Sequence, residues 1–299
     1  MVDLLLEKFD AVQVDASARI SPEDAEYCGG EQIAYERAHK LYTDFRNSLA
    51  VAIPLEMEDW AARTGNSVTD YRSTKYCETY NDGGLDQIDS RIKKIQGAFI
   101  DEIKSYFTRK YDIELDSSIR EKLGFNKPRR ENSMSEEKWE AVLEEYRIKC
   151  SRPLHYNEIV DEILLQLDGL TFTDKVAQQI KDTAKLKAYD RNSSRNKRYF
   201  EIDKKVIRFE GFTGLYENHN SILRALWHFN TGLTSMAGSY WSNRFCFSYQ
   251  NERDRMVGTH DLGDSRKVCK FRYFKSGRWD ITFGSEELAE AFARDYLGY

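Results

Sequence analysis

The sequence is short of proline and of paired cysteines. It has only four prolines in 299 residues and no low-complexity segment, so long disordered stretches are not expected. Its five cysteines are scattered and include no CxxC pair, which argues against a disulfide framework and a structural zinc site. We expect free thiols in a reducing compartment.

Long apolar runs are missing as well. No stretch of eighteen apolar residues occurs, so no membrane-spanning helix is predicted. The first residues, MVDLLLEKFDAVQVD, lack the basic start and the small-residue cleavage site of a signal peptide. These observations predict a protein of the cytosol.

The common catalytic signatures are also absent from the sequence. Gly29-Gly30 and Gly83-Gly84 lack the lysine and the preceding apolar strand that a phosphate-binding loop requires. The dinucleotide fingerprint, HExxH and GxSxG do not occur. The pattern favours a protein that binds over an enzyme, and we expect no cofactor and no bound metal.

What the chain does contain is enough apolar material for a core. Apolar residues make up 40% and aromatic residues 13%, and the net charge is −5. The charge is unevenly placed: residues 1–31 carry eight acids and two bases, whereas residues 185–210 carry nine bases and four acids. Such blocks are commonly solvated surface, and the alternative is a patch for phosphate or an acidic partner.

The last thirty residues give the clearest structural pattern, a hairpin followed by a helix. Strands are predicted over 268–274 and 278–283, joined through Gly277, and Ser285 is placed to cap a helix that runs to about 298. Alternation predicts two sets of residues on one buried face: Cys269, Phe271 and Tyr273, and Trp279, Ile281 and Phe283.

Upstream of this unit the apolar spacing is mostly helical. One helix is predicted over 33–53 with Pro54 as its stop, and a core helix over 85–106. We divide the chain into a helical region over 1–134, a helical connecting region over 135–190 and an α+β domain over 191–299. The predicted fold class is α+β, with an antiparallel sheet near the C-terminus.

Aromatic residues in weakly patterned segments are candidates for partner binding. Aromatic side chains are enriched at interface centres, and this chain has more of them than one core readily hides. We expect some to be exposed in the free protein and buried in a homo-oligomer or a host complex, together with the polar loop 250–265. The candidates are Trp60, Tyr71, Tyr76, Tyr80, Tyr240 and Trp241.

The basic block supplies a second set of candidates. Its cations could contact phosphate or an acidic partner, and nucleic-acid contact through them is expected to be weak. The residues concerned are Arg191, Arg195, Lys197 and Arg198.

A metal-dependent nuclease is the remaining enzymatic reading. Asp203 and Lys205 follow a predicted strand, and Asp190 or Glu201 could serve as a second carboxylate for a metal ion. The alternative for this short motif is a solvated turn at the tip of a hairpin.

The C-terminal third resembles an uncharacterised domain family of phages, plasmids and prophage islands. The resemblance lies in RYFKSGRWDITFGSEELAEAFARDYLG at 272–298, KKVIRFEGF at 204–212 and ILRALWHFNTG at 222–232. Ser276 stands where that family favours Asn. The resemblance implies a mobile-element protein without an established enzymatic role.

In size, in its helical first half and in lacking an active-site motif, the chain also resembles the phage-encoded inhibitors of the Gabija defence system. That resemblance implies a non-enzymatic protein that oligomerises, encloses a host nuclease–ATPase complex and blocks its DNA site. A DNA-associated accessory module is the alternative function.

Overall fold

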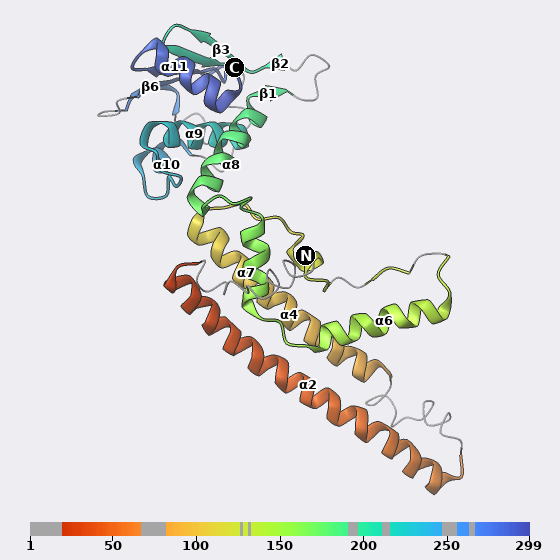
Figure 1. The fold of residues 1–299 in the computed structure, drawn as a ribbon. Helices are drawn as coiled ribbons and strands as arrows, with labels where there is room; N and C mark the ends of the chain where they lie inside the picture. Colours follow the sequence, from red (N-terminus) through yellow and green to blue (C-terminus); the bar gives the residue numbers. More distant parts are fainter. Residues whose placement is uncertain are drawn as a thin grey trace, which may run out of the picture. The chain divides into compact units, whose positions relative to one another are not determined.

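The computed structural model describes residues 20–66, 82–125, 128–130, 133–190, 197–210, 216–246, 256–262 and 267–299. Helices fill the first part of the chain and a five-stranded antiparallel sheet lies in the last third, so the predicted α+β class is confirmed (Figure 1). Among these residues, no helix is both long enough and apolar enough to cross a bilayer.

The chain divides into two compact units. The first comprises Met1–Thr108 and Leu115–Gly169, and the second comprises Arg109–Glu114 and Leu170–Tyr299. This division differs from the three predicted ranges, because helix α8 (Phe172–Lys187) packs on helix α9 (Tyr216–Thr231) of the sheet-bearing unit. The predicted connecting region 135–190 is therefore shared between the units.

The first unit is built from helices alone in its described part. The elements are α2 (Pro22–Thr64), α4 (Asp82–Tyr111, whose last three residues belong to the second unit), α5 (Ile119–Lys122), α6 (Glu136–Ser151) and α7 (Tyr156–Leu165). The predicted core stripe of α4 is confirmed, since Ile88, Ile92, Phe99 and Ile103 are buried.

Helix α2 runs well past its predicted end. Ser21 and Asp24 form a capping box at its start, and Gly65 ends it with a φ of 67°. Pro54 lies inside the helix, so the prediction that Pro54 stops it was wrong. Proline removes one backbone hydrogen bond, but Pro54 is exposed, where water can satisfy the freed carbonyl, and good helix formers follow it.

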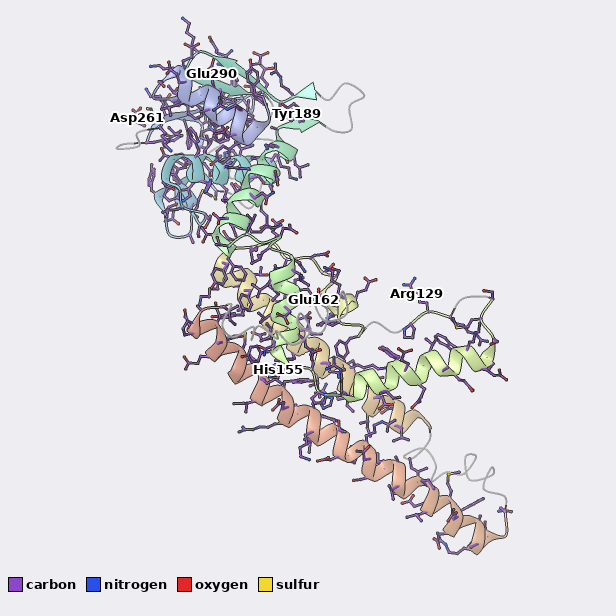
Figure 2. All side chains as sticks on the ribbon, in the orientation of Figure 1. Arg129, His155, Glu162, Tyr189, Asp261 and Glu290 are labelled. Atoms are coloured by element: carbon purple, nitrogen blue, oxygen red, sulfur yellow. The ribbon has the colours of Figure 1, made fainter. Side chains whose placement is uncertain are left out.

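The second unit carries the sheet, whose strand order is β3-β4-β7-β6-β5 with antiparallel neighbours throughout. Its strands are β3 (Phe200–Asp203), β4 (Val206–Phe209), β5 (Gly258–Asp261), β6 (Val268–Tyr273) and β7 (Trp279–Phe283). A separate two-stranded ladder joins β1 (Tyr189–Asp190) to β2 (Lys197–Arg198). Asp261 on the edge strand β5 pairs with Lys270 at 3.2 Å (Figure 2).

The C-terminal hairpin follows the prediction with one change. Strand β6 pairs with β7 so that Phe271 faces Ile281 and Tyr273 faces Trp279. A bulge between Val268 and Lys270 shifts the register, and Cys269 is only half-buried. The prediction that Cys269 shares the buried face was wrong because the extra residue of a bulge reverses the alternation before it, so Val268 takes the core position.

Two segments differ from expectation between these strands. The segment 250–265 was predicted as a loop, yet Gly258–Asp261 form the edge strand β5. Phe245, Phe247 and Tyr249 alternate in sequence as a strand would, but Phe245 lies in the short helix α10 (Tyr240–Phe245), which Ser239 caps through the Ser242 N–H. Sequence alternation at aromatic residues cannot distinguish a short amphipathic helix from a strand.

The chain ends in helix α11 (Glu286–Phe292), which continues into a π-helical turn over Ala293–Leu297. Ser285 accepts a hydrogen bond from the Leu288 N–H, as predicted for the cap. Phe292 is buried against Phe283 of β7, and Tyr296 is buried against Phe229 and His228 of α9. Tyr189, labelled in Figure 2, donates a hydrogen bond to the Gly298 carbonyl at 3.1 Å and so ties the ladder to this end.

Candidate protein interaction surfaces

The inward face of α2 is polar rather than apolar. Its buried residues are Asp24, Cys28, Gln32, Tyr35 and His39, which recur every three or four residues and so share one side of the helix. Asp24 is fully buried and accepts a hydrogen bond from the Tyr106 hydroxyl of α4 at 2.9 Å. Burial, with Asp24 nearby, raises the pKa of the Cys28 thiol to about 12, so this thiol stays protonated.

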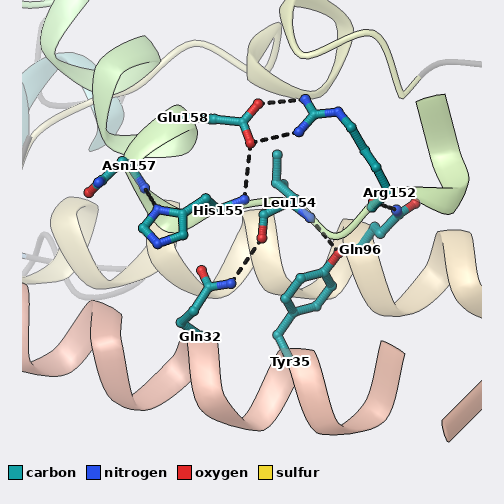
Figure 3. Close-up of polar contacts among 8 residues, drawn as sticks. All are labelled: Gln32, Tyr35, Gln96, Arg152, Leu154, His155, Asn157 and Glu158. Atoms are coloured by element: carbon teal, nitrogen blue, oxygen red, sulfur yellow. Dashed lines mark hydrogen bonds and ion pairs between the residues drawn. The ribbon is translucent and has the colours of Figure 1, made fainter. Parts of the chain in front are cut away.

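This polar face holds the loop between α6 and α7. Tyr35 accepts a hydrogen bond from the Leu154 N–H at 2.9 Å, and Gln32 donates to the Leu154 carbonyl at 3.0 Å (Figure 3). Gln32 also accepts from the Tyr156 N–H at 2.7 Å. Because a buried backbone group without a partner is costly, the loop requires these polar side chains. The face of α2 that turns inward is therefore fixed by the loop.

The same loop is braced by its own ion pair. Arg152 forms a bidentate salt bridge with Glu158, in which its two terminal guanidinium nitrogens lie 3.0 and 2.6 Å from the carboxylate oxygens. Glu158 also accepts a hydrogen bond from the His155 N–H (Figure 3). These contacts lower the pKa of Glu158 against the opposing effect of burial. Gln96 of α4 donates to the Arg152 carbonyl at 3.3 Å, so both long helices hold the loop.

The outward face of α2 carries five large apolar side chains that are each more than half exposed. We call this set the outer stripe. Its members and their exposed fractions are Ile33 (52%), Leu41 (66%), Phe45 (52%), Val51 (66%) and Leu55 (61%). Apolar spacing in the sequence identified the helix, but the packed side of that helix is the opposite one.

The second half of α2 has little support from α4. The two helices run antiparallel, since Tyr27 stacks on Tyr106, Tyr35 on Phe99, and Arg46 pairs with Asp89 (Figure 1). Because both α-helices rise by the same distance per residue, these contacts place the first residue of α4 opposite about residue 53 of α2. No described side chain of α2 after His39 is fully buried.

Helix α6 has a partly covered apolar face. Trp139, Val142 and Leu143 are half-buried, and Ile148 is exposed. Tyr146 is buried, donates to the Phe125 carbonyl at 3.1 Å and has the Lys93 ammonium over its ring. This face is a smaller exposed apolar surface of the first unit.

The predicted aromatic contact residues are divided between the two units and the part of the chain outside the described residues. Trp60 is half-buried near the end of α2, and Tyr240 is 61% exposed on α10 of the other unit. Tyr71, Tyr76 and Tyr80 lie outside the described residues.

Trp241 is a core residue, which corrects its prediction as a surface anchor. It is 4% exposed, and its ring meets Trp227 edge-on at 5.5 Å and Phe271 at 5.0 Å. Helix α10 turns Trp241 and Phe245 inward together at i, i+4 spacing, which leaves Tyr240 outside.

The predicted basic candidates are described only in part. Arg191 and Arg195 lie outside the described residues, and Lys197 is described only as backbone in β2. Arg198 is exposed, with its guanidinium 5.5 Å from the Phe200 ring and 5.3 Å from the Tyr299 ring. Arg198 therefore presents a cation held against aromatic rings.

Two of the carboxylates proposed for a metal site, Glu201 and Asp203, lie on the hairpin of β3 and β4, and the third, Asp190, lies in β1. Asp203 ends β3, Lys204 takes a positive φ of 52° in the turn, and the Asp203 carboxylate lies 3.7 Å from Arg208. Glu201 is paired in register with Arg208. Within the described residues, no group of three or more His, Cys, Asp or Glu side chains is arranged to hold a metal ion.

A buried histidine lies in the aromatic core of the second unit. His219 contacts the Trp279 ring at a centroid distance of 4.6 Å, and its Nε2 lies 2.9 Å from the Tyr273 hydroxyl. Burial lowers the pKa of His219 to about 4 and raises that of Tyr273 well above its usual value. Both groups are therefore neutral near pH 7, and the imidazole and the hydroxyl share this hydrogen bond.

Comparison with protein-family models, with curated proteins and with solved structures gives no match to this chain. The resemblances drawn from its motifs thus stay predictions. In the sequence, the outer stripe and the polar set from Asp24 to His39 both have helical spacing. Spacing alone therefore predicts two faces of one helix and does not show which of them is exposed.

Proposed function

We propose that this protein is not an enzyme and acts by binding other proteins, with the outer stripe of α2 as a contact surface. The supporting observation is the reversed polarity of α2, which buries polar residues and exposes five large apolar side chains. Contiguous exposed apolar surface is typical of protein interaction sites. Its burial against a partner would remove that surface from water.

More specifically, we propose a phage or mobile-element protein that inhibits a bacterial anti-phage defence complex of the Gabija type in the host cytoplasm. An inhibitor that works by occupancy needs a large interface, on the order of 1,600 Å² in total. Oligomers that enclose the nuclease–ATPase and cover its DNA site would supply one. The resemblance of 204–212, 222–232 and 272–298 to mobile-element proteins supports this context.

Co-expression with a Gabija-type system in phage-challenged bacteria tests this function. We expect the wild-type chain to restore plaques and to co-purify with the nuclease–ATPase. Leu41→Asp with Leu55→Asp should abolish both effects, while Leu233→Asp, at a residue 58% exposed in the second unit, should retain them. Defence that persists with the wild-type chain well expressed and folded would overturn the Gabija assignment.

Nucleic-acid contact is a second candidate function, favoured by the exposed Arg198 beside Phe200 and Tyr299. Phosphate contacts release counterions, so such binding must weaken as salt increases. We expect only weak binding to DNA. A submicromolar affinity at physiological salt that is lost on replacing Arg195, Lys197 and Arg198 by Ala would make the DNA-associated module the leading function.

The nuclease alternative is tested by Asp203→Ala and Lys205→Ala. Asp203 lies at a solvated hairpin turn, with 63% of its side chain exposed, so we expect both variants to keep full inhibitory activity. Loss of activity in both variants, with circular dichroism unchanged, would favour the nuclease.

A further inference from the structure

On the outward face of α2, five residues spaced seven apart have the same order of residue types from either end. Counted from Ser48, they are Ala34, Leu41, Ser48, Leu55 and Ala62, and all five are exposed. Seven residues are close to two helical turns, so these side chains lie on nearly one line along the helix. The segment from Ala34 to Ala62 spans about 42 Å at 1.5 Å per residue.

From this symmetry we propose that the outward face of α2 pairs antiparallel with α2 of a second copy of the chain, with the two-fold axis at Ser48. The inference rests on the proposed function, in which this face is buried against protein, and it specifies that the protein covering the face is a second copy of the same chain. An interface between identical copies must be self-complementary. The sequence around Ser48 meets that condition.

The apolar residues match across this axis. Leu41 comes level with Leu55 of the other copy, and Phe45 with its Val51. Small residues lie at the axis and at both ends, where Ala34 meets Ala62, and small side chains let two helices approach closely. Most of the outer stripe would thus be covered by its own counterpart.

The charges fix the direction of the pair. Arg37 comes level with Asp59 of the other copy, and the symmetry produces this contact twice. Within the described chain, Arg37 makes no ion pair, and Asp59 pairs only with Arg63 of its own helix, at 2.8 Å. A parallel pair in the same register would instead place Arg37 beside Arg37 and Asp59 beside Asp59, which repel.

Cysteine cross-linking tests the axis directly. Ser48→Cys should form a disulfide-linked dimer under mild oxidation, because the two copies of residue 48 meet at the axis, within the reach of a disulfide. Asn47→Cys is the matched control: it is the neighbouring exposed residue and points about 100° away around the helix. Wild-type protein, with its five cysteines, is the blank.

Mixed variants test the direction. Leu41→Cys and Leu55→Cys should cross-link when mixed but not alone, since each residue and its own copy lie about 21 Å apart along the pair. A disulfide between two copies of the Leu41→Cys variant, joined at position 41 and identified in the linked peptide by mass spectrometry, would overturn the antiparallel arrangement.

Charge exchange tests the ion pairs. Arg37→Asp and Asp59→Arg should each weaken the dimer about tenfold in sedimentation dilution series, because two pairs become repulsive. The double variant should recover most of the loss.

Two outcomes separate this inference from the proposed function. Cross-linking of Ser48→Cys no stronger than that of Asn47→Cys, or a wild-type chain that stays monomeric at about 100 μM, overturns the pairing. If that monomeric protein still binds the host complex, and the Leu41→Asp variant does not, the protein-binding function stands. The outer stripe then contacts the host protein rather than a second copy.

Discussion

The two units of this chain differ in how their amphipathic elements pack: in the first, the long helix α2 buries mainly polar side chains, whereas in the second the sheet buries aromatic ones. In the first, Asp24, Gln32 and His39 of α2 are buried beside the apolar stripe of α4, while large apolar residues of α2 face outward. In the second, Trp279 lies among the rings of Phe209, Phe271 and Tyr273. The comparison teaches that helical periodicity reveals a helix but not which of its faces is packed.

The largest contrast is expected from truncating one tryptophan in each unit. Trp279→Ala removes a fully buried ring and should lower the free energy of unfolding by about 3–5 kcal/mol, from lost burial and the cavity left behind. Trp60→Ala on the half-exposed end of α2 should lower it by less than about 1 kcal/mol. Denaturant unfolding followed by circular dichroism measures both, and equal losses would contradict the difference between the units.

Acid should weaken the second unit through His219. Its imidazole is neutral when folded, with a pKa of about 4, whereas the unfolded chain takes up a proton below its ordinary value of 6.5. The contribution of His219 to the free energy of unfolding is therefore fully present above pH 6.5, and the free energy of unfolding falls by about 3 kcal/mol as the pH drops toward 4. His228, whose pKa is also lowered, acts in the same direction.

The measurement is urea unfolding at about pH 7 and about pH 4.5 for wild type and His219→Gln. The variant cannot titrate, so its stability should depend less on pH across this window. An unchanged dependence would mean that His219 is not the group responsible.

In the first unit the sensitive contact is a single hydroxyl. Tyr35→Phe leaves the buried Leu154 N–H without its acceptor and should cost about 1–3 kcal/mol. Tyr42→Phe, on the same helix, is the control and should be nearly neutral. Thermal unfolding of the two variants distinguishes the loop anchor from a general effect of losing a hydroxyl.

The smallest effect on folding is expected at the outer stripe. Leu41→Ala and Leu55→Ala remove exposed side chains and should change the free energy of unfolding at low protein concentration by no more than about 0.5 kcal/mol. Light scattering over a concentration series should nevertheless show weaker association. A large loss of stability in dilute solution would mean that α2 packs on this face within one chain.

Much of the second unit could be predicted because its determinants are local. Gly277 in the hairpin turn, the alternation in β7 and the Ser285 cap each act within a few residues, and the structure agrees with all three. The helix of Trp241 could not be predicted from alternation, since its burial depends on Trp227 and Phe271, which are distant in sequence.

By itself, the sequence determined the α+β class, the helical first half and the C-terminal hairpin with its helix, since short-range periodicity, turns and caps encode them. Only the tertiary structure decided which face of α2 is packed. The α6–α7 loop has backbone groups that must be satisfied away from water, and Gln32 and Tyr35 on one side of α2 can do so. That long-range requirement turns the polar side inward and leaves Leu41, Phe45 and Leu55 outside.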